Sequence, residues 1–249
     1  MYQSERADAI IKILKKYHYV TVDFLVEQIC YSPATIRRDL TFLEKQGVVK
    51  RSYGGVEIKD DNYTPFRFRQ HSMKKEKNSI AHFAASLVKD GDTVFIDGST
   101  SAQFLGHFLE QKKDLTVVTN NMILGIQLKE YGINTYVTGG YISEMPGILA
   151  GEITNKTYGM FHADIMFFST IGFDKNNVYE NSETYYQHHQ KMFENSSVRV
   201  YLCGSNKIGK QGRLVNCAID ELDYVVSDNE IDEEIKNLHP NTKFVCVGN

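Results

Sequence analysis

The sequence has no tryptophan, only four prolines and four cysteines, and no long uninterrupted apolar run. A membrane-spanning helix needs about 18 or more consecutive apolar residues, so we expect none and no membrane partner. The segment 1–8 is polar and carries Glu5 and Asp8, unlike the apolar core of a secretory signal. These absences predict a protein of the cytoplasm.

The four cysteines form no CxxC pair and no other short spacing. Thiolate metal sites need clustered ligands, and disulfides persist mainly in exported proteins. We therefore expect free thiols, no metal and no cofactor. Cys30, Cys203 and Cys246 lie in apolar segments and are predicted to be small core residues.

The length and charge suggest two unlike parts. The 249 residues allow one large domain or two smaller ones, and 42% hydrophobic residues are typical of a folded protein. Residues 1–58 contain nine Lys and Arg against seven Asp and Glu, whereas the remainder contains nineteen against twenty-four. The net charge of −3 therefore conceals a mildly basic head on an acidic body.

Three helices are predicted in the head. Apolar residues at helical spacing predict the first over 5–17, and the N-cap Thr21 precedes the second over 22–30. The third has the clearest beginning, because Ser32 is followed by a proline, and it is expected to stop at Gly47.

A hairpin is predicted after these helices, with strands over 48–51 and 56–58 around a glycine pair. Three helices and a hairpin make a winged helix-turn-helix, whose third helix would enter the major groove. Arginine can pair with guanine or phosphate there. A solvated surface helix or a protein-binding module remains an alternative. The predicted DNA contacts are Ser32, Thr35, Arg37, Arg38, Arg51 and Gly54.

The head also resembles a known family. The stretches S-P-A-T-I-R-R-D-L (32–40), L-E-K-Q-G (43–47) and R-S-Y-G-G-V (51–56) are similar to the DNA-binding head of the DeoR family of bacterial repressors. Tyr53 stands where that family usually has histidine. The resemblance implies a double-stranded operator as partner. One such head reads too little DNA alone, so at least a homodimer is expected, and the resemblance allows a homotetramer.

The body, 75–249, follows a linker over 59–74 and alternates short apolar strands with helices. This alternation predicts an α/β domain with a mostly parallel sheet. The strands are expected at 93–96, 115–118, 133–137, 165–168, 198–202, 224–226 and 243–247, and the helices at 75–88, 100–109, 121–129, 183–194 and 230–237.

Ligands of such sheets bind beyond the carboxyl ends of the strands. The first strand ends in Asp97-Gly98-Ser99-Thr100-Ser101, the second in Thr119-Asn120 and the third in Thr138-Gly139-Gly140. Small residues, backbone N–H groups and hydroxyls can hold a phosphate. The alternative is that these residues only form turns. No GxGxxG or GxxxxGK[ST] motif occurs, which argues against a dinucleotide or a P-loop nucleotide.

The body in turn resembles the DeoR-family sensor domain, which shares its fold with ribose-5-phosphate isomerase. The resemblance implies a phosphorylated sugar effector that changes the affinity for DNA. The ligand-binding residues so predicted are Asp97, Gly98, Ser99, Thr100, Ser101, Thr119, Asn120, Gly139, Gly140, Gly151, Asp174, Glu183, Lys191 and Lys207. Ile171 and Gly204 depart from the family pattern, which usually has an acid or amide at the first position and aspartate at the second.

Two other functions are alternatives to an effector-controlled regulator. An active sugar-phosphate isomerase would need a carboxylate base, for which Asp174 and Glu183 are the only nearby candidates, and the Lys-Gly-Gly-Gly run of those enzymes is absent. We therefore expect no enzyme. A regulator whose body serves only oligomerisation is the other alternative. His188 and His189 are expected on a helix surface, where neighbouring side chains point about 100° apart and cannot chelate one metal.

Overall fold

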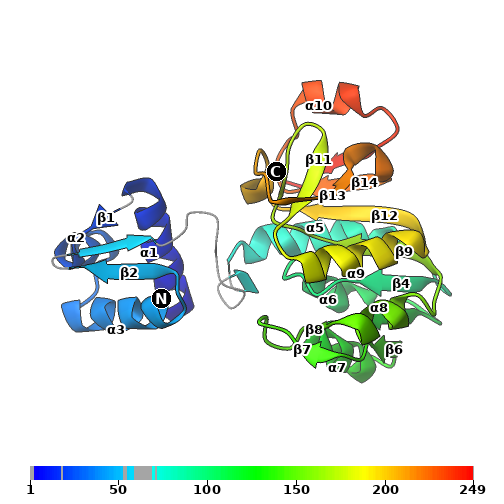
Figure 1. Ribbon diagram of the computed structural model, residues 1–249, viewed down its shortest axis with the longest axis horizontal. Helices are drawn as coiled ribbons and strands as arrows, with labels where there is room; N and C mark the ends of the chain where they lie inside the picture. Colours follow the sequence, from blue (N-terminus) through cyan, green and yellow to red (C-terminus); the bar gives the residue numbers. More distant parts are fainter. Residues whose placement is uncertain (1–2, 18, 53–54, 59–68, 71, 249) are drawn as a thin grey trace. The chain divides into compact units, whose positions relative to one another are not determined.

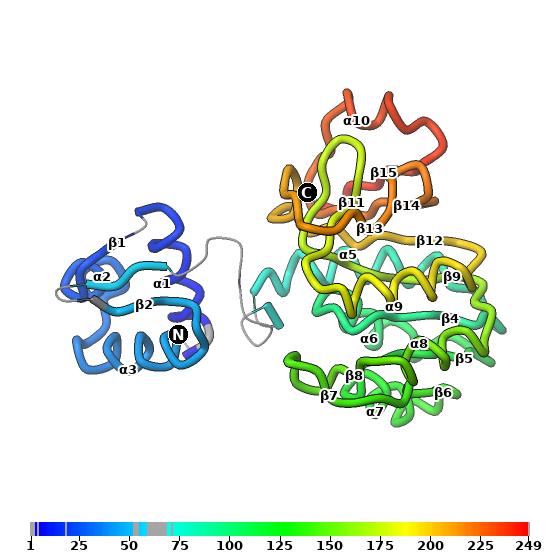
Figure 2. The backbone as a smooth tube through the Cα atoms, in the orientation of Figure 1, coloured from blue at the N-terminus to red at the C-terminus, as the bar shows by residue number. Residues whose placement is uncertain are grey.

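The computed structural model describes residues 3–17, 19–52, 55–58, 69–70 and 72–248. The chain divides into two compact units, residues 1–74 and 75–249 (Figures 1 and 2). Each unit has its own hydrophobic core, so the head and the body are described separately.

The head contains the three expected helices, α1 (Gln3–Tyr17), α2 (Val22–Ile29) and α3 (Pro33–Lys45). Both predicted N-caps are confirmed. The Thr21 hydroxyl accepts a hydrogen bond from the Phe24 N–H at 3.2 Å, and the Ser32 hydroxyl accepts one from the Thr35 N–H at 3.2 Å. Gly47 follows α3 with a φ of 72°, as expected for the residue that ends a helix.

A three-stranded antiparallel sheet closes the head, in the order β1 (Tyr19–Val20), β3 (Gly55–Ile58), β2 (Val49–Ser52). The hairpin of β2 and β3 was predicted, but β1 was not, because two residues carry no periodicity. A Cβ on Gly55 would lie 2.7 Å from the Val20 carbonyl oxygen, so only glycine allows this approach. The hairpin turn, including Gly54, lies outside the described residues.

A buried ion pair joins the first and third helices of the head. Arg6 Nε donates to Asp39 Oδ2 at 2.7 Å, and Arg6 Nη2 donates to Asp39 Oδ1 at 3.2 Å. Asp39 is fully buried among the apolar side chains of the head core. Two parallel bonds fix the relative position of the helices more strictly than apolar packing alone.

The body is built on a seven-stranded sheet in which every neighbouring pair is parallel. This confirms the predicted α/β class. In sheet order the strands are β15 (Lys243–Cys246), β14 (Tyr224–Ser227), β12 (Ser196–Cys203), β9 (Ala163–Phe168), β4 (Thr93–Ile96), β5 (Thr116–Thr119) and β6 (Asn134–Val137). The chain runs outward from β4 to β6 and then returns to β9, so the order reverses between β4 and β9.

Helices cover both faces of this sheet (Figure 1). One core lies under α5 (Lys74–Ser86), α6 (Gly106–Leu109) and α7 (Met122–Glu130). The other lies under α8 (Glu152–Tyr158) and α9 (Glu183–Glu194). The remaining helices are α10 (Glu233–Leu238) and the 3-10 turns η1 (Ala102–Leu105), η2 (Ser205–Lys207) and η3 (Ile219–Glu221).

Three features differ from expectation. The helix predicted over 100–109 is split into η1 and α6 at Gly106, where a Cβ would lie 2.7 Å from Leu124 Cδ1 of α7. Helix α10 begins at Glu233, three residues later than predicted, behind the N-cap Asp232. Helix α8 was not predicted.

Two small antiparallel sheets were also not predicted. They are the hairpin of β7 (Tyr141–Ile142) and β8 (Leu149–Ala150), and a sheet of β10 (Gly172–Phe173), β11 (Asn177–Glu180) and β13 (Leu214–Ala218).

The prediction for the cysteines was wrong at Cys30. This residue ends α2 with a φ of 57° and donates its N–H to the Val26 carbonyl, and its side chain is exposed. Cys246 is only half-buried, whereas Cys203 is buried as expected. No helix among the described residues is long and apolar enough to cross a membrane.

We predict that Asp39→Ala unfolds the head without unfolding the body. Removing one partner of a buried ion pair leaves an uncompensated charge and costs about 3–5 kcal/mol, which is close to the whole stability of a small domain. Thermal unfolding followed by circular dichroism should show an early transition for the head. Glu27→Ala, an exposed acid on α2, is the control, and an unchanged head transition in Asp39→Ala would contradict the prediction.

Candidate functional site

The exposed face of α3 presents two unpartnered cations. Arg37 and Arg38 are exposed, and neither guanidinium makes a hydrogen bond or ion pair with another residue of the described ranges. Ser32 and Thr35 lie at the beginning of the same helix, with their hydroxyls 3.0 Å apart. The helix therefore offers two free arginines beside its positive N-terminal end.

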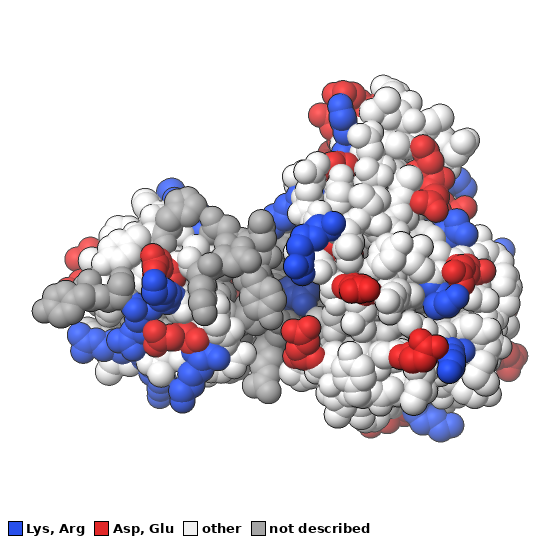
Figure 3. Space-filling view, viewed as in Figure 1, with Lys and Arg blue, Asp and Glu red and all other residues white. Residues whose placement is uncertain are grey.

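Strand β2 adds a third arginine to this face. Arg51 Nη1 donates to the Thr41 hydroxyl of α3 at 3.3 Å, and the Arg51 N–H donates to Glu44 Oε1 at 3.3 Å. Lys50 instead pairs with Glu57 across the hairpin at 3.3 Å. Figure 3 shows Lys and Arg side chains gathered on the head over α3 and β2, with acidic side chains interspersed among them.

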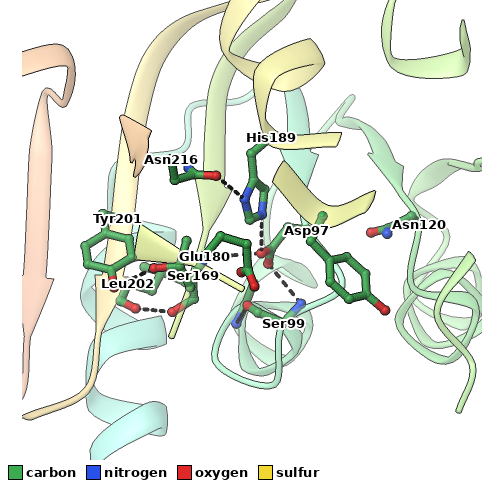
Figure 4. Close-up of polar contacts among 12 residues, drawn as sticks. Asp97, Ser99, Asn120, Ser169, Glu180, His189, Tyr201, Leu202 and Asn216 are labelled. Carbon is green, nitrogen blue, oxygen red and sulfur yellow. Dashed lines mark hydrogen bonds and ion pairs between the residues drawn. The ribbon is translucent and has the colours of Figure 1, made fainter. Parts of the chain in front are cut away.

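The second candidate site lies at the carboxyl ends of β4 and β9, where the strand order reverses. Asp97 follows β4 and is 4% exposed. Its Oδ1 accepts from the Ser99 N–H at 3.0 Å, and its Oδ2 accepts from the Ser169 N–H, which follows β9, at 3.0 Å (Figure 4). Open parallel sheets bind ligands at such a switch point.

The loop after Asp97 has free backbone donors. The N–H groups of Gly98, Thr100 and Ser101 have no hydrogen-bond partner within the part of the chain that the structure describes. Ser99 and Ser101 flank the Thr100 hydroxyl, and the Ser99 hydroxyl accepts from the Ala102 N–H at 3.2 Å. Closely spaced N–H groups of this kind form an anion-binding concavity.

The neighbouring strand ends converge on the β7–β8 hairpin. Asn120 Nδ2 donates to the Leu149 carbonyl at 2.9 Å, and the Thr119 hydroxyl accepts from the Asn121 N–H at 3.1 Å. The Gly139 carbonyl accepts from the Thr154 hydroxyl at 2.7 Å. These residues therefore shape the rim of the site, and the side-chain and carbonyl groups named here are engaged with protein partners.

Two glycines of the rim have backbone conformations that residues with a side chain rarely adopt. Gly140 has a φ of 126°, and a Cβ there would lie 2.3 Å from the Ala150 carbonyl oxygen. Gly151 has a φ of 103° and donates its N–H to His188 Nε2 at 3.3 Å. Both glycines therefore have conformational roles, since their backbones are constrained by the hairpin and by α9.

The two histidines of α9 were predicted to be exposed, and this is wrong. His188 and His189 are both buried. His189 Nε2 donates to Asp97 Oδ2 at 3.2 Å, and His189 Nδ1 lies 3.1 Å from Asn216 Oδ1 (Figure 4). They occupy the apolar stripe of α9, four residues before Met192 and Phe193. That spacing was the signal that could have placed them inside.

Although they are adjacent on one helix, the two histidines have pKa values shifted in opposite directions. Burial opposes protonation of His189, but the hydrogen bond to Asp97 and the charges of Asp97 and Glu180 outweigh it and raise the pKa of His189. Burial, with the neighbouring His189, lowers the pKa of His188 to about 4. With oxygen atoms facing both of its ring nitrogens, His189 is placed to donate twice, which only the imidazolium form can do.

Of the remaining predicted ligands, only Lys207 contacts this site. Its ammonium group donates to the Ser169 hydroxyl, which in turn donates to the Leu202 carbonyl. Lys191 pairs with Glu194 at 2.5 Å, and Glu183 is exposed in the first turn of α9. Neither of these two side chains makes a contact with the described residues of the rim.

Asp174 belongs to a separate network in the loop between β10 and β11. Burial alone would raise its pKa, but four hydrogen bonds, among them those from the Tyr179 hydroxyl at 2.7 Å and Gln211 Nε2 at 2.6 Å, lower the pKa of Asp174 to about 2. A carboxylate with so low a pKa is a weak general base at neutral pH. Asp174 is therefore poorly suited to proton abstraction.

Three polar residues of this region were not predicted: Ser169, Glu180 and Asn216. Ser169 follows a buried strand, as Asp97 does. The rule that ligands bind beyond the carboxyl ends of parallel strands therefore applied to both residues. Glu180 and Asn216 lie on the small antiparallel sheet that was not predicted, and Glu180 Oε1 accepts from the N–H groups of the next two residues at 2.7 and 3.1 Å. Within the described residues, no group of three or more His, Cys, Asp or Glu could hold a metal ion.

Comparison with known families matches most of the chain. Residues 6–62 match the DeoR-like helix-turn-helix domain, and residues 72–229 match the DeoR C terminal sensor domain. The lactose phosphotransferase system repressor of Streptococcus mutans is 31% identical, over 98% of this chain and 100% of the relative. The glycerol-3-phosphate regulon repressor of Escherichia coli is 29% identical, over 92% of each chain.

Among solved structures, ribose 5-phosphate isomerase from Plasmodium falciparum aligns with a TM-score of 0.41 and 13% sequence identity. The alignment covers 57% of this chain and 55% of the isomerase, so it spans little more than half of either. The curated relatives named above are repressors, not enzymes.

We predict that the stability contributed by His189 declines as the pH rises. Because the pKa of His189 is raised in the folded state, its contribution is complete below the unfolded value of about 6.5 and is lost as the pH passes the folded pKa. Urea unfolding between pH 6 and 9 should show the free energy of unfolding falling more steeply for the wild type than for His189→Gln.

His188→Gln is the matched control with the opposite sign. Since the pKa of His188 is lowered to about 4, its contribution is present above about pH 6.5 and is lost only at lower pH. That variant should therefore follow the wild-type slope between pH 7 and 9. Parallel wild-type and His189→Gln profiles over the whole range would contradict the assignment of His189.

Proposed function

The chain belongs to the DeoR family of DNA-binding transcriptional regulators, and from this premise we propose that it is a repressor controlled by a phosphorylated sugar or similar small metabolite. The head binds a double-stranded operator, and the body binds the effector. Since its target is chromosomal DNA, we assign it to the cytoplasm.

The observation that carries the effector proposal is the loop of Gly98, Thr100 and Ser101, with three free N–H groups at the switch point. A phosphate group accepts several such hydrogen bonds at once, and the Thr100 hydroxyl adds a further donor. Asp97 is already held by Ser99, Ser169 and His189. The carboxylate therefore fixes the loop, and it does not contact the phosphate, since both groups are hydrogen-bond acceptors.

The remainder of the effector is expected to differ from a typical family ligand. Ile171 provides no polar contact where the family pattern has an acid or amide, and its side chain lies against Gly212. Lys207 and the Ser169 hydroxyl lie beyond the carboxyl end of the next strand. They support binding of a hydroxyl or a second oxygen of the metabolite on the side of the loop nearest β9.

For the head, we propose that Arg37 and Arg38 contact base edges and phosphates, with Thr35 and Arg51 at the groove margins. Ser32 acts mainly as the helix cap, and Gly54 remains a predicted wing contact. One recognition helix reads one half-site, so an operator with two half-sites requires at least two copies of the chain. Effector binding would then shift the population between arrangements of the heads that do and do not fit the operator.

We predict that Arg38→Ala weakens operator binding by about 1–3 kcal/mol, the usual contribution of one bidentate base contact. The operator would first be selected from genomic fragments by the wild-type protein, and the affinity measured by gel shift at one salt concentration. Lys89→Ala, an exposed lysine of the body, is the control. Equal affinity for Arg38→Ala and wild type would remove Arg38 from the interface.

The effector site is tested by thermal shift with a panel of sugar phosphates and the matching unphosphorylated sugars. A compound that binds the folded state raises its melting temperature, and we expect at least one phosphorylated compound to do so while its sugar does not. If no phosphorylated compound acts, the effector proposal fails and the body serves assembly only.

The compound so found gives a sharper test by calorimetry. Thr100→Val keeps the side-chain shape but removes one hydroxyl, so we expect the effector affinity to fall by about 1.5–3 kcal/mol, the contribution of a hydrogen bond to a charged group. Thr93→Val makes the same change at the opposite end of β4 and should bind as wild type. An unchanged dissociation constant in Thr100→Val would exclude that hydroxyl from the site.

A further inference from the structure

The two edges of the seven-stranded sheet differ in how they are protected. Soluble proteins usually protect an edge strand with charged side chains or proline, because its free N–H and C=O groups can pair with another chain. The edge strand β15 begins with Lys243, whose ammonium group donates to the Tyr224 hydroxyl at 3.3 Å. The opposite edge, β6, has the sequence Asn-Thr-Tyr-Val and carries neither device.

Exposed apolar side chains surround this unprotected edge. Seven of them, each between 39% and 63% exposed, form what we call the edge patch: Ile123 and Ile126 of α7, Tyr136 and Val137 of β6, Tyr141 and Ile142 of β7, and Ile153 of α8. In Figure 1 these four elements lie together at one end of the body.

Close contacts make the edge patch continuous. A Cβ on Gly125 would lie 2.3 Å from Val137, and one on Gly139 would lie 2.6 Å from Ile153. The hairpin is joined in the same way, because Cβ atoms on Gly147 and Gly151 would lie 3.0 Å from Ile123 and 2.9 Å from Tyr141. The patch therefore runs from α7 across β6 to α8 and the hairpin.

The size of the edge patch fits a stable protein interface. Seven large apolar side chains at about half exposure form a patch on the order of several hundred Å², which is larger than most soluble monomers expose. It is comparable to the roughly 800 Å² that each partner buries in a standard interface. Its flanking charges on α8 balance, since Glu152 pairs with Lys156 at 3.7 Å.

We propose that the edge patch is the surface through which two copies of this chain associate, with β6 of one copy antiparallel to β6 of the other. A two-fold axis places the same surface opposite itself, so the partner must supply an apolar surface and a free strand edge, and this chain has both in one place. The pairing would extend the sheet across the dimer and remove its unprotected edge.

The same hairpin that contributes to the edge patch also contacts the anion-binding loop. Ile148 is fully buried and would lie 2.6 Å from a Cβ on Gly98. Leu149 donates its N–H to the Asn120 carbonyl at 2.8 Å, while its neighbouring strand residues Tyr141 and Ile142 face the edge patch. The dimer surface and the effector loop are thus separated by one hairpin, which gives effector binding a direct path to the interface.

The test is the mass of the full-length protein in solution, measured by sedimentation without DNA or effector. We expect the wild type to sediment as a multiple of 28.5 kDa, and Ile126→Asp and Ile142→Asp to fall to half of that mass or less at the same concentration. Leu238→Asp is the matched control, because Leu238 is 50% exposed on α10, away from β6, and it should keep the wild-type mass.

Two further measurements distinguish loss of the interface from misfolding, and pairing through β6 from association through another surface. The circular dichroism spectra of all three variants should match that of the wild type and so show a folded body. The two edge-patch variants should melt at a lower temperature, because assembly stabilises the folded state. Hydrogen exchange over residues 133–138 should be slow in the wild type and faster in Ile126→Asp, because the outer edge of β6 is released from pairing.

A wild-type monomer at micromolar concentration, or an unchanged mass in both edge-patch variants, would overturn the proposal. So would dissociation by Leu238→Asp alone. The proposed dimer surface rests on the proposed function, which requires at least two copies of the chain. The mass of the protein is nevertheless measured without any ligand. A failure of the effector site would therefore leave these results unchanged, and a failure here would leave the effector site intact.

Discussion

The buried carboxylate of Asp97 is the interaction on which the body depends. Its two oxygens accept hydrogen bonds from the loop after β4, from the end of β9 and from α9, through Ser99, Ser169 and His189. A buried charge is tolerable only when its hydrogen bonds are satisfied. Two of these partners, Ser169 and His189, are distant in the sequence. Satisfying Asp97 therefore also fixes the loop, whose N–H groups at Gly98, Thr100 and Ser101 have no partner among the described residues.

The head uses a buried carboxylate in a comparable way. In the run Arg37-Arg38-Asp39, the first two side chains are exposed and the third is buried against Arg6. Successive helical residues point about 100° apart, so one short motif supplies both the surface cations and the anchor that holds α3 on α1. The position of the recognition helix and its ability to contact DNA therefore depend on the same few residues.

The strand order places the functions of the body. The order reverses between β4 and β9, and the loop of Gly98 lies at this switch point. The strands that follow β4 along the chain run outward and leave β6 as an edge. The β7–β8 hairpin lies between these two places and contacts the loop through Ile148. Coupling between two sites requires an element that both of them contact, and the β7–β8 hairpin is such an element between the proposed effector loop and the proposed dimer surface.

The sequence by itself determined what depends on neighbours along the chain: the N-caps Thr21 and Ser32, the strand–helix alternation and the polar strand end at Asp97. Only the tertiary structure decided which polar residues are buried and with whom. His189 and Asp97 are 92 residues apart, and Asn216 reaches them from β13, a strand that was not predicted. Local patterns record which face of a helix is apolar, but a buried polar contact is set by long-range packing, which no spacing in the sequence encodes.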